Sequence, residues 1–202
     1  MKNFFLFLIL FLFGQKTFAG FQIQAGALLF GYKEIEMSGS NTIKSETVTS
    51  RPDNQISYTA SIGYQFKWLE PLSIKTSVGY LAYRTQESKV DLSTDNGTYE
   101  TNMFDARLTA QISLNNYFSL RFGISYPFST ELKGPMNSTS GDDTYQLRGE
   151  IGYHASFGYH FAENTHVRLG YIRNSAGKAE AESNLDVHAT YNHLVLELGT
   201  GF

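Results

Sequence analysis

The chain has 202 residues, of which 15% are aromatic and 17% charged, with a formal net charge of −3 and no cysteine. Its length suits a single domain, and the missing cysteines exclude disulfides, thiol chemistry and lipid attachment through cysteine. A mildly acidic chain without a basic tract gives no basis for nucleic-acid binding.

The N-terminus has the pattern of a secretory signal peptide. A positive start at Lys2 precedes an uninterrupted apolar run over residues 4–13, and Thr17 and Ala19 put small side chains before a cleavage point. The run is too short for a membrane-spanning helix. We therefore predict a signal peptide over residues 1–19 and one domain over residues 20–202. Cleavage would remove Lys2 and Lys16 and change the net charge to −5.

Residues 55–68 show the pattern that recurs through the rest of the chain. Even positions from Ile56 to Trp68 are apolar or aromatic, whereas odd positions from Gln55 to Lys67 are polar or small. Strand side chains alternate between two faces, so this segment predicts a strand with one apolar and one polar face. It is about twice the usual strand length in soluble proteins and long enough to cross a bilayer at a tilt.

The same alternation predicts eight strands joined by long and short connections in turn. The first expected strand, residues 21–33, needs a bulge near Gly26 because its apolar parity changes there. Polar segments predict long loops at residues 34–54, 86–100, 129–144 and 174–186. Short turns are expected at residues 69–71, 115–116 and 162–164. We predict an all-β fold, an eight-stranded antiparallel up-and-down transmembrane β-barrel.

The polar face carries the charges that decide which side is the interior. A soluble ligand-carrying barrel such as a lipocalin has the same period but an apolar interior, and this face would make a poor soluble core because unpaired buried charge is costly. Lipid would accept the other, apolar face, provided that the barrel is closed. The candidate lumen residues are Lys75, Asp105, Arg107, Arg121, Arg148, Glu150, Arg168 and Glu197.

Aromatic residues of the apolar face gather at two heights, as two membrane interfaces would require. Those near the short turns are Tyr64, Phe66, Trp68, Tyr159 and Phe161, and those near the long loops include Tyr126 and Phe128.

The C-terminal segment LVLELGTGF resembles the closing strand of bacterial outer-membrane proteins, with Leu194, Leu196, Leu198 and the terminal Phe202 as its signal residues. The whole chain resembles the small outer-membrane barrels of the OmpA, OmpX and opacity-protein type. The resemblance implies integration into a Gram-negative outer membrane, with lipid and lipopolysaccharide around the barrel and both termini periplasmic. It also implies recognition by the barrel-assembly machinery during insertion.

The lumen charges favour a structural plug over a conducting pore. By height along the strands, Glu197 is expected near Arg168 with Arg121 within reach, and Asp105, Arg148 and Glu150 are expected to form an upper cluster. Buried charges must be paired to be tolerated, and eight strands leave barely enough room for side chains. A narrow, porin-like channel is the alternative.

An enzymatic alternative depends on His154 and Ser156, which could pair a base with a nucleophile. The pair is similar to the His/Ser arrangement of the outer-membrane lipid A deacylases, but Phe157 stands where that family has Asn, and His154 is expected to face inward. The histidine spacing does not indicate a metal site. We predict no catalytic residue, metal or cofactor. The expected role is non-enzymatic, structural or surface-interacting, through loops that contact lipopolysaccharide, a host or a phage.

Overall fold

The structure is a computed structural model that describes residues 19–39, 46–50, 57–69, 71–88, 97–134, 143–162, 164–179 and 185–202. The predicted signal peptide lies outside these residues except for Ala19, and it stays a prediction. No helix in the described part of the chain is long and apolar enough to cross a membrane.

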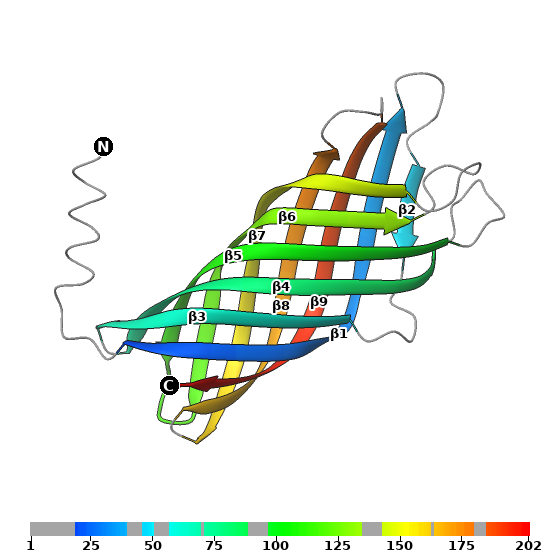
Figure 1. The fold of residues 1–202 in the computed structure, drawn as a ribbon. Helices are drawn as coiled ribbons and strands as arrows, with labels where there is room; N and C mark the ends of the chain where they lie inside the picture. The colour runs from blue at the N-terminus through cyan, green and yellow to red at the C-terminus, as the bar shows by residue number, and fades with distance from the viewer. Residues whose placement is uncertain are drawn as a thin grey trace, which may run out of the picture.

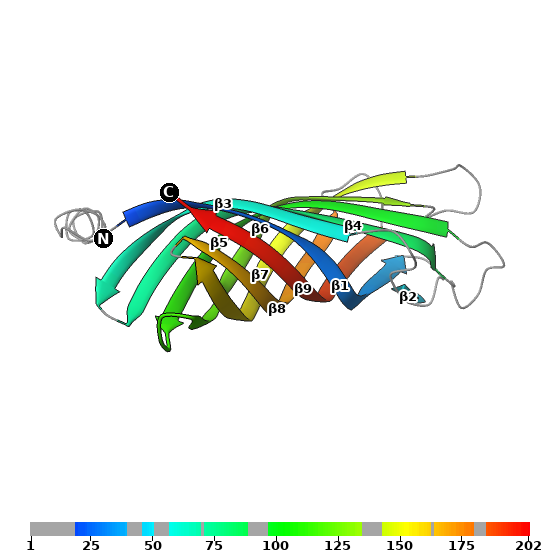
Figure 2. The same cartoon turned by 90° about the horizontal axis from the view of Figure 1, so that it is seen from below.

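Eight strands form a closed antiparallel barrel (Figure 1), as the alternation predicted. Consecutive strands pair around the wall, and the last strand returns to the first through a ladder from Gln22 opposite Gly201 to Gly39 opposite Leu185. Figure 2 shows this closure from below, with the first and last strands of the barrel side by side. The strands are β1 (Ala19–Gly39), β3 (Ser57–Leu69), β4 (Leu72–Ser88), β5 (Gly97–Ser113), β6 (Phe118–Gly134), β7 (Asp143–Ala162), β8 (Thr165–Ala179) and β9 (Leu185–Gly201).

The strands continue well into the segments expected to be loops, so the predicted loop boundaries are wrong. The upper part of β1 pairs with an additional strand, β2 (Glu46–Ser50), inside the predicted loop 34–54. β4 runs to Ser88, β6 to Gly134 and β8 to Ala179. Serine and threonine made these segments look like loops, but polar residues pair as strands when a neighbouring strand offers a ladder.

The bulge expected near Gly26 lies further along the strand. The β1–β9 register shifts between Leu28 and Phe30, and the extra residue, Leu29, faces outward with 40% of its surface exposed. At Gly26 the ladder is regular, and an added Cβ would lie 2.5 Å from the carbonyl oxygen of Leu196. Glycine is therefore required there by close approach between strands and not by a bulge.

The two faces of the wall differ as the sequence predicted. On β5, Leu108 exposes 49% of its surface on the outside, whereas the next residue, Thr109, exposes 4%. Apolar residues stand opposite one another across the outer face, as in the row Ile23, Ile62, Val78 and Ala106. The wall thus separates an apolar exterior from a packed interior.

Candidate functional site: the filled barrel interior

The half of the interior nearer the long loops is packed mainly with apolar side chains, with the buried polar residues Thr101, Thr130, Asn174, Asn192 and His193 among them. We call the apolar side chains the apolar plug. At its centre Tyr83 of β4 and Tyr191 of β9 stack with ring centroids 4.6 Å apart, and the Tyr191 hydroxyl lies 3.1 Å from Thr101 Oγ1 on β5. β9 is a neighbour of neither β4 nor β5, so both contacts cross the interior. The plug consists of Leu28, Leu81, Tyr83, Met103, Leu132, Leu147, Ile172, Ala176, Val187, Ala189, Tyr191 and Val195, each at most 8% exposed.

The half nearer the short turns holds a buried network of charges, which we call the basic network. Its members are Lys75, Asp105, Arg107, Arg121, Arg168 and Glu197, each at most 8% exposed. These are four cations and two carboxylates. Among the described residues, the buried charges of the lumen therefore carry two formal positive charges in excess.

Arg107 forms ion pairs with both carboxylates of this network. Its Nε lies 2.9 Å from each oxygen of Asp105, and its Nη1 lies 3.8 Å from Glu197 Oε1. Arg168 stands directly opposite Glu197 in the β8–β9 ladder, but the ion pair of Glu197 goes to Arg107. The expectation that Glu197 lies near Arg168 is therefore confirmed, but its ion pair reaches across the interior to Arg107, which was not expected.

The other three cations donate to amide oxygens. Arg121 Nε donates to Gln111 Oε1 at 2.5 Å, and Arg168 Nη2 donates to the same oxygen at 3.3 Å. Lys75 Nζ donates to Gln24 Oε1 at 2.6 Å. Two guanidinium groups thus meet at one neutral acceptor.

Arg148 and Glu150, which were expected in the lumen, are exposed instead. The β7–β8 register shifts between Leu147 and Arg148 and again between Glu150 and Tyr153. Such bulges break the alternation of faces, so Leu147 takes the inward place and Arg148 turns outward. Glu150 lies 3.2 Å from His188 Nε2 at the surface. The predicted upper cluster with Asp105 does not form.

His154 lies on the lumen side, where its Nε2 is 2.9 Å from Thr109 Oγ1. Within the described residues its Nδ1 is buried without a hydrogen-bond partner, so no carboxylate orients the ring as a catalytic base would require. Ser156 stands opposite Arg121 in the ladder. No three His, Cys, Asp or Glu side chains of the described segments gather as metal ligands.

Outward-facing aromatic rings contact one another in two groups. Near the long loops, Tyr58, Tyr80, Phe104 and Phe128 form a row across four strands, with neighbouring centroids 4.8 to 6.3 Å apart. Near the short turns, Tyr64 contacts Phe21 and Phe66, and Tyr159 contacts Phe118. Tyr126, Tyr159 and Phe161 expose 44%, 42% and 55% of their surfaces. The side chain of Trp68 lies outside the described residues.

The proposed assembly residues face outward on β9. Leu194, Leu196 and Leu198 expose 41%, 42% and 57% of their surfaces, and Phe202 exposes 76%. The backbone N–H of Phe202 donates to the carbonyl oxygen of Phe21 at 2.9 Å, which holds the C-terminus against β1.

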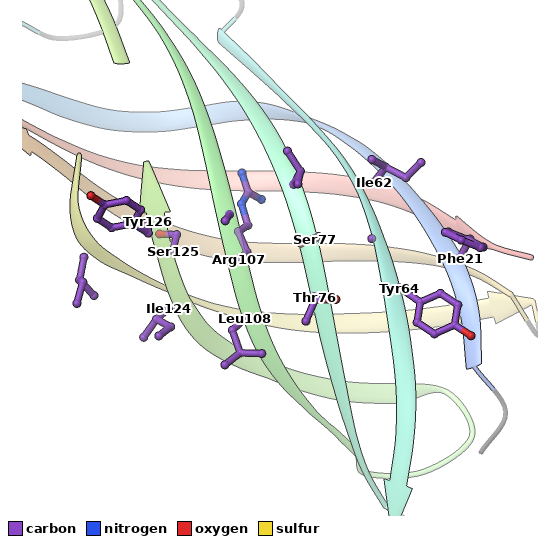
Figure 3. Close-up of a pocket in the computed structure, with 14 residues that line it drawn as sticks. Phe21, Ile62, Tyr64, Thr76, Ser77, Arg107, Leu108, Ile124, Ser125 and Tyr126 are labelled. Atoms are coloured by element: carbon purple, nitrogen blue, oxygen red, sulfur yellow. The ribbon is translucent and has the colours of Figure 1, made fainter. Parts of the chain in front are cut away.

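A shallow hollow of about 740 Å³ lies on the apolar outer face over β3 to β6, with Phe21 of β1 and Ile151 of β7 at its edges (Figure 3). Thr76 and Ala106 have small side chains there, between larger neighbours such as Tyr64 and Tyr126. Figure 3 shows Leu108 and Arg107 pointing away from each other, because consecutive residues serve opposite faces. The charge of Arg107 therefore belongs to the lumen and not to this hollow.

Comparison with known proteins finds the family described as outer membrane protein beta-barrel domain, matched over residues 5–197. No curated protein matches the chain. Neisserial surface protein A is 16% identical with a TM-score of 0.55, over 90% of this chain and 97% of that one. The Escherichia coli outer membrane protease OmpT is 9% identical with a TM-score of 0.50, over 91% and 97% of the two chains. The Pseudomonas aeruginosa outer membrane protein OprG is 10% identical with a TM-score of 0.47, over 91% and 96%. At these identities the likeness to Neisserial surface protein A and to OmpT indicates a shared fold alone.

Proposed function

The chain belongs to the outer membrane protein β-barrel domain family and is an outer-membrane barrel, and on this premise we propose that it is a non-conducting, non-enzymatic barrel that presents surface loops. The observation that carries the proposal is the filled lumen. The apolar plug occupies one half of the interior, and the basic network occupies the other.

Conduction through an eight-stranded barrel needs a continuous wet path, and the interior of such a barrel is only just wide enough for its own side chains. The stacked Tyr83 and Tyr191 are 1% and 0% exposed and lie in the middle of that interior. Because an apolar layer excludes water and ions, the plug argues against the porin-like alternative.

Single-channel recording on the refolded protein in planar bilayers tests this part of the proposal. We expect no conductance steps from the unaltered protein or from Arg121→Gln and Glu197→Gln, two changes within the basic network. Steps in the unaltered protein whose size changes in either variant would establish the channel instead.

With the lumen closed, the regions left for an interaction are the segments that connect the strands at the long-loop end. We propose that these segments face the exterior and contact lipopolysaccharide or a host or phage surface, with both termini on the periplasmic side. Outer-membrane lipid would surround the apolar face, and the barrel-assembly machinery would read the segment ending at Phe202. No cofactor enters this proposal.

Replacement of residues 89–96 or 135–142 by Gly/Ser segments of equal length tests the surface role. We expect cells carrying these variants to lose binding to immobilised lipopolysaccharide or to lose phage adsorption, with barrel folding unchanged. A matched Gly/Ser replacement of the short turn at 115–116 should leave binding intact. Unaltered binding in every long-loop variant would contradict the surface role, whereas an altered acyl pattern of lipid A in cells containing the protein would support an enzyme.

A further inference from the structure

Arg121 and Arg168 come together in the lumen at one shared hydrogen-bond acceptor. Both guanidinium groups donate to Gln111 Oε1, so two like charges are held together by one neutral oxygen. The side chains are 5% and 1% exposed, so water screens little of their repulsion. Like charges at short range in a buried site need an opposite charge nearby.

Among the described residues, the carboxylate near this pair is Glu197, which stands opposite Arg168 in the β8–β9 ladder but shares its charge with Arg107. Asp105 is bound by Arg107, and Glu197 lies 3.8 Å from the same arginine. The remaining partner of Arg121 is Gln22, whose Oε1 accepts a hydrogen bond from Nη2 at 3.0 Å. Each side-chain hydrogen bond of Arg121 and Arg168 is thus accepted by an amide, and neither arginine makes a direct ion pair among the described residues.

Arg168 also has hydrogen-bonding capacity left over. Its Nε and Nη1 atoms are buried and have no hydrogen-bond partner in the described part of the chain. A buried guanidinium N–H without an acceptor costs more than a neutral donor in the same position. The two unused donors lie on either side of Nη2, which donates to Gln111, so each edge of the guanidinium keeps one N–H from which an oxyanion can accept a hydrogen bond.

From this geometry we propose that the short-turn half of the lumen contains a binding site for a small inorganic anion, held between Arg168 and Arg121. Lys75 lies close enough to act electrostatically on the same site. The anion would accept a hydrogen bond from an unused donor of Arg168 and offset the two excess positive charges of the basic network.

Access to the site is from the short-turn end. Gln22, Gln65 and His160 are partly exposed at that end of the interior, and Gln22 contacts both Gln65 and Arg121. The apolar plug closes the opposite end. The proposed site would therefore bind an anion without conducting it.

Thermal unfolding of the refolded protein in a phosphate-free, non-ionic detergent tests the proposal. Inorganic phosphate or chloride replaces gluconate at constant ionic strength, so that screening does not change. A ligand that binds only the folded state raises the unfolding temperature along a saturating curve. We expect such a rise for the unaltered protein, and no dependence on either anion would overturn the proposal. Because this detergent contains no lipid phosphate, a rise would come from the free anion.

Two substitutions test whether the anion-dependent rise in unfolding temperature comes from binding at Arg168. Arg168→Gln should abolish the rise, whereas Arg148→Gln, which removes an equal charge from an exposed position, should keep it. If both variants lost the anion-dependent rise equally, the rise would depend only on the net charge of the protein, and the proposed site at Arg168 would be wrong. Equilibrium dialysis with radioactive phosphate measures the same binding directly, and it should show binding to Arg148→Gln and none to Arg168→Gln.

Gln111→Glu gives the sharpest test because it puts a fixed carboxylate at the oxygen that both arginines share. With its own counter-charge in place, this variant should unfold at a higher temperature without added anion and should no longer respond to phosphate. A lower unfolding temperature, or a retained phosphate response, would contradict the proposal even if Arg168→Gln fails to refold.

Discussion

Tyr83 and Tyr191 stack inside the barrel with their ring planes inclined by 20°, although they come from opposite parts of its wall. Tyr83 also contacts His193, with centroids 4.6 Å apart. A transmembrane barrel is usually described by its lipid-facing apolar surface, but here a second apolar region lies within the lumen. It resembles the core of a small soluble β-barrel, and it ties non-adjacent strands together.

Tyr191→Ala should remove the centre of the plug and lower the free energy of unfolding by about 3–5 kcal/mol, the range for large aromatic residues in packed cores. Urea unfolding of the refolded barrel, followed by circular dichroism, measures the change. Tyr117→Ala is the control, since Tyr117 is 59% exposed in a turn, and its loss should be much smaller. Equal costs would mean that the interior is not packed.

Leu108→Arg should cost about 2–4 kcal/mol in lipid vesicles, because it places a charge on the lipid-facing side of β5. The neighbouring Thr109→Ser keeps a hydroxyl beside His154 and should change stability by much less. The same unfolding titration compares the two. A larger effect at Thr109 would reverse the assignment of the faces.

Gly79→Ala should destabilise the barrel by about 1–3 kcal/mol through overpacking. A Cβ at this position would lie 2.3 Å from Asp105 Oδ1 and 2.6 Å from Arg107 Nη2, so it would push against the ion pair. Gly201→Ala is the matched control, because its nearest neighbour would be 3.6 Å away. Unfolding titrations that show equal stability for both variants would indicate that the interior yields easily.

Orientation in the membrane can be measured cleanly because the chain has no cysteine of its own. A cysteine replacing the exposed Lys133, near the long-loop end, should react with a membrane-impermeant maleimide on intact cells. A cysteine replacing Asn116, in a short turn, should react only after the outer membrane is opened. The reverse pattern would place the long loops on the periplasmic side.

The sequence predicted the number of barrel strands and the direction of most side chains, because lipid imposes a strict two-residue period. Leu108 and Thr109 are typical of this success. The prediction failed at Arg148, where bulges in β7 interrupt the period. Bulges leave little trace in one sequence, since a single additional residue is enough to exchange the faces.

The apolar plug was missed for a different reason. Leu81 and Met103 occupy inward positions. We expected the whole lumen to be polar, although in the described part of the chain only the half near the short turns holds the buried charged side chains. The pairing of Glu197 with Arg107 was missed because it joins β9 to β5 across the interior, and contacts of that kind depend on strand tilt and stagger. The height of a residue along its own strand therefore does not predict contacts across the interior.

The hydrogen bond between Phe202 and Phe21 makes the two ends of the barrel domain spatial neighbours, so the fold has no intrinsic first strand. A circular permutant that links Phe202 to Gly20 and opens between Asn115 and Asn116 would keep every ladder of the wall. Such a chain should refold in detergent like the original. In cells, however, Phe202 would no longer be terminal. The permutant would therefore test separately whether the barrel is stable and whether the proposed signal at Phe202 is needed for its insertion.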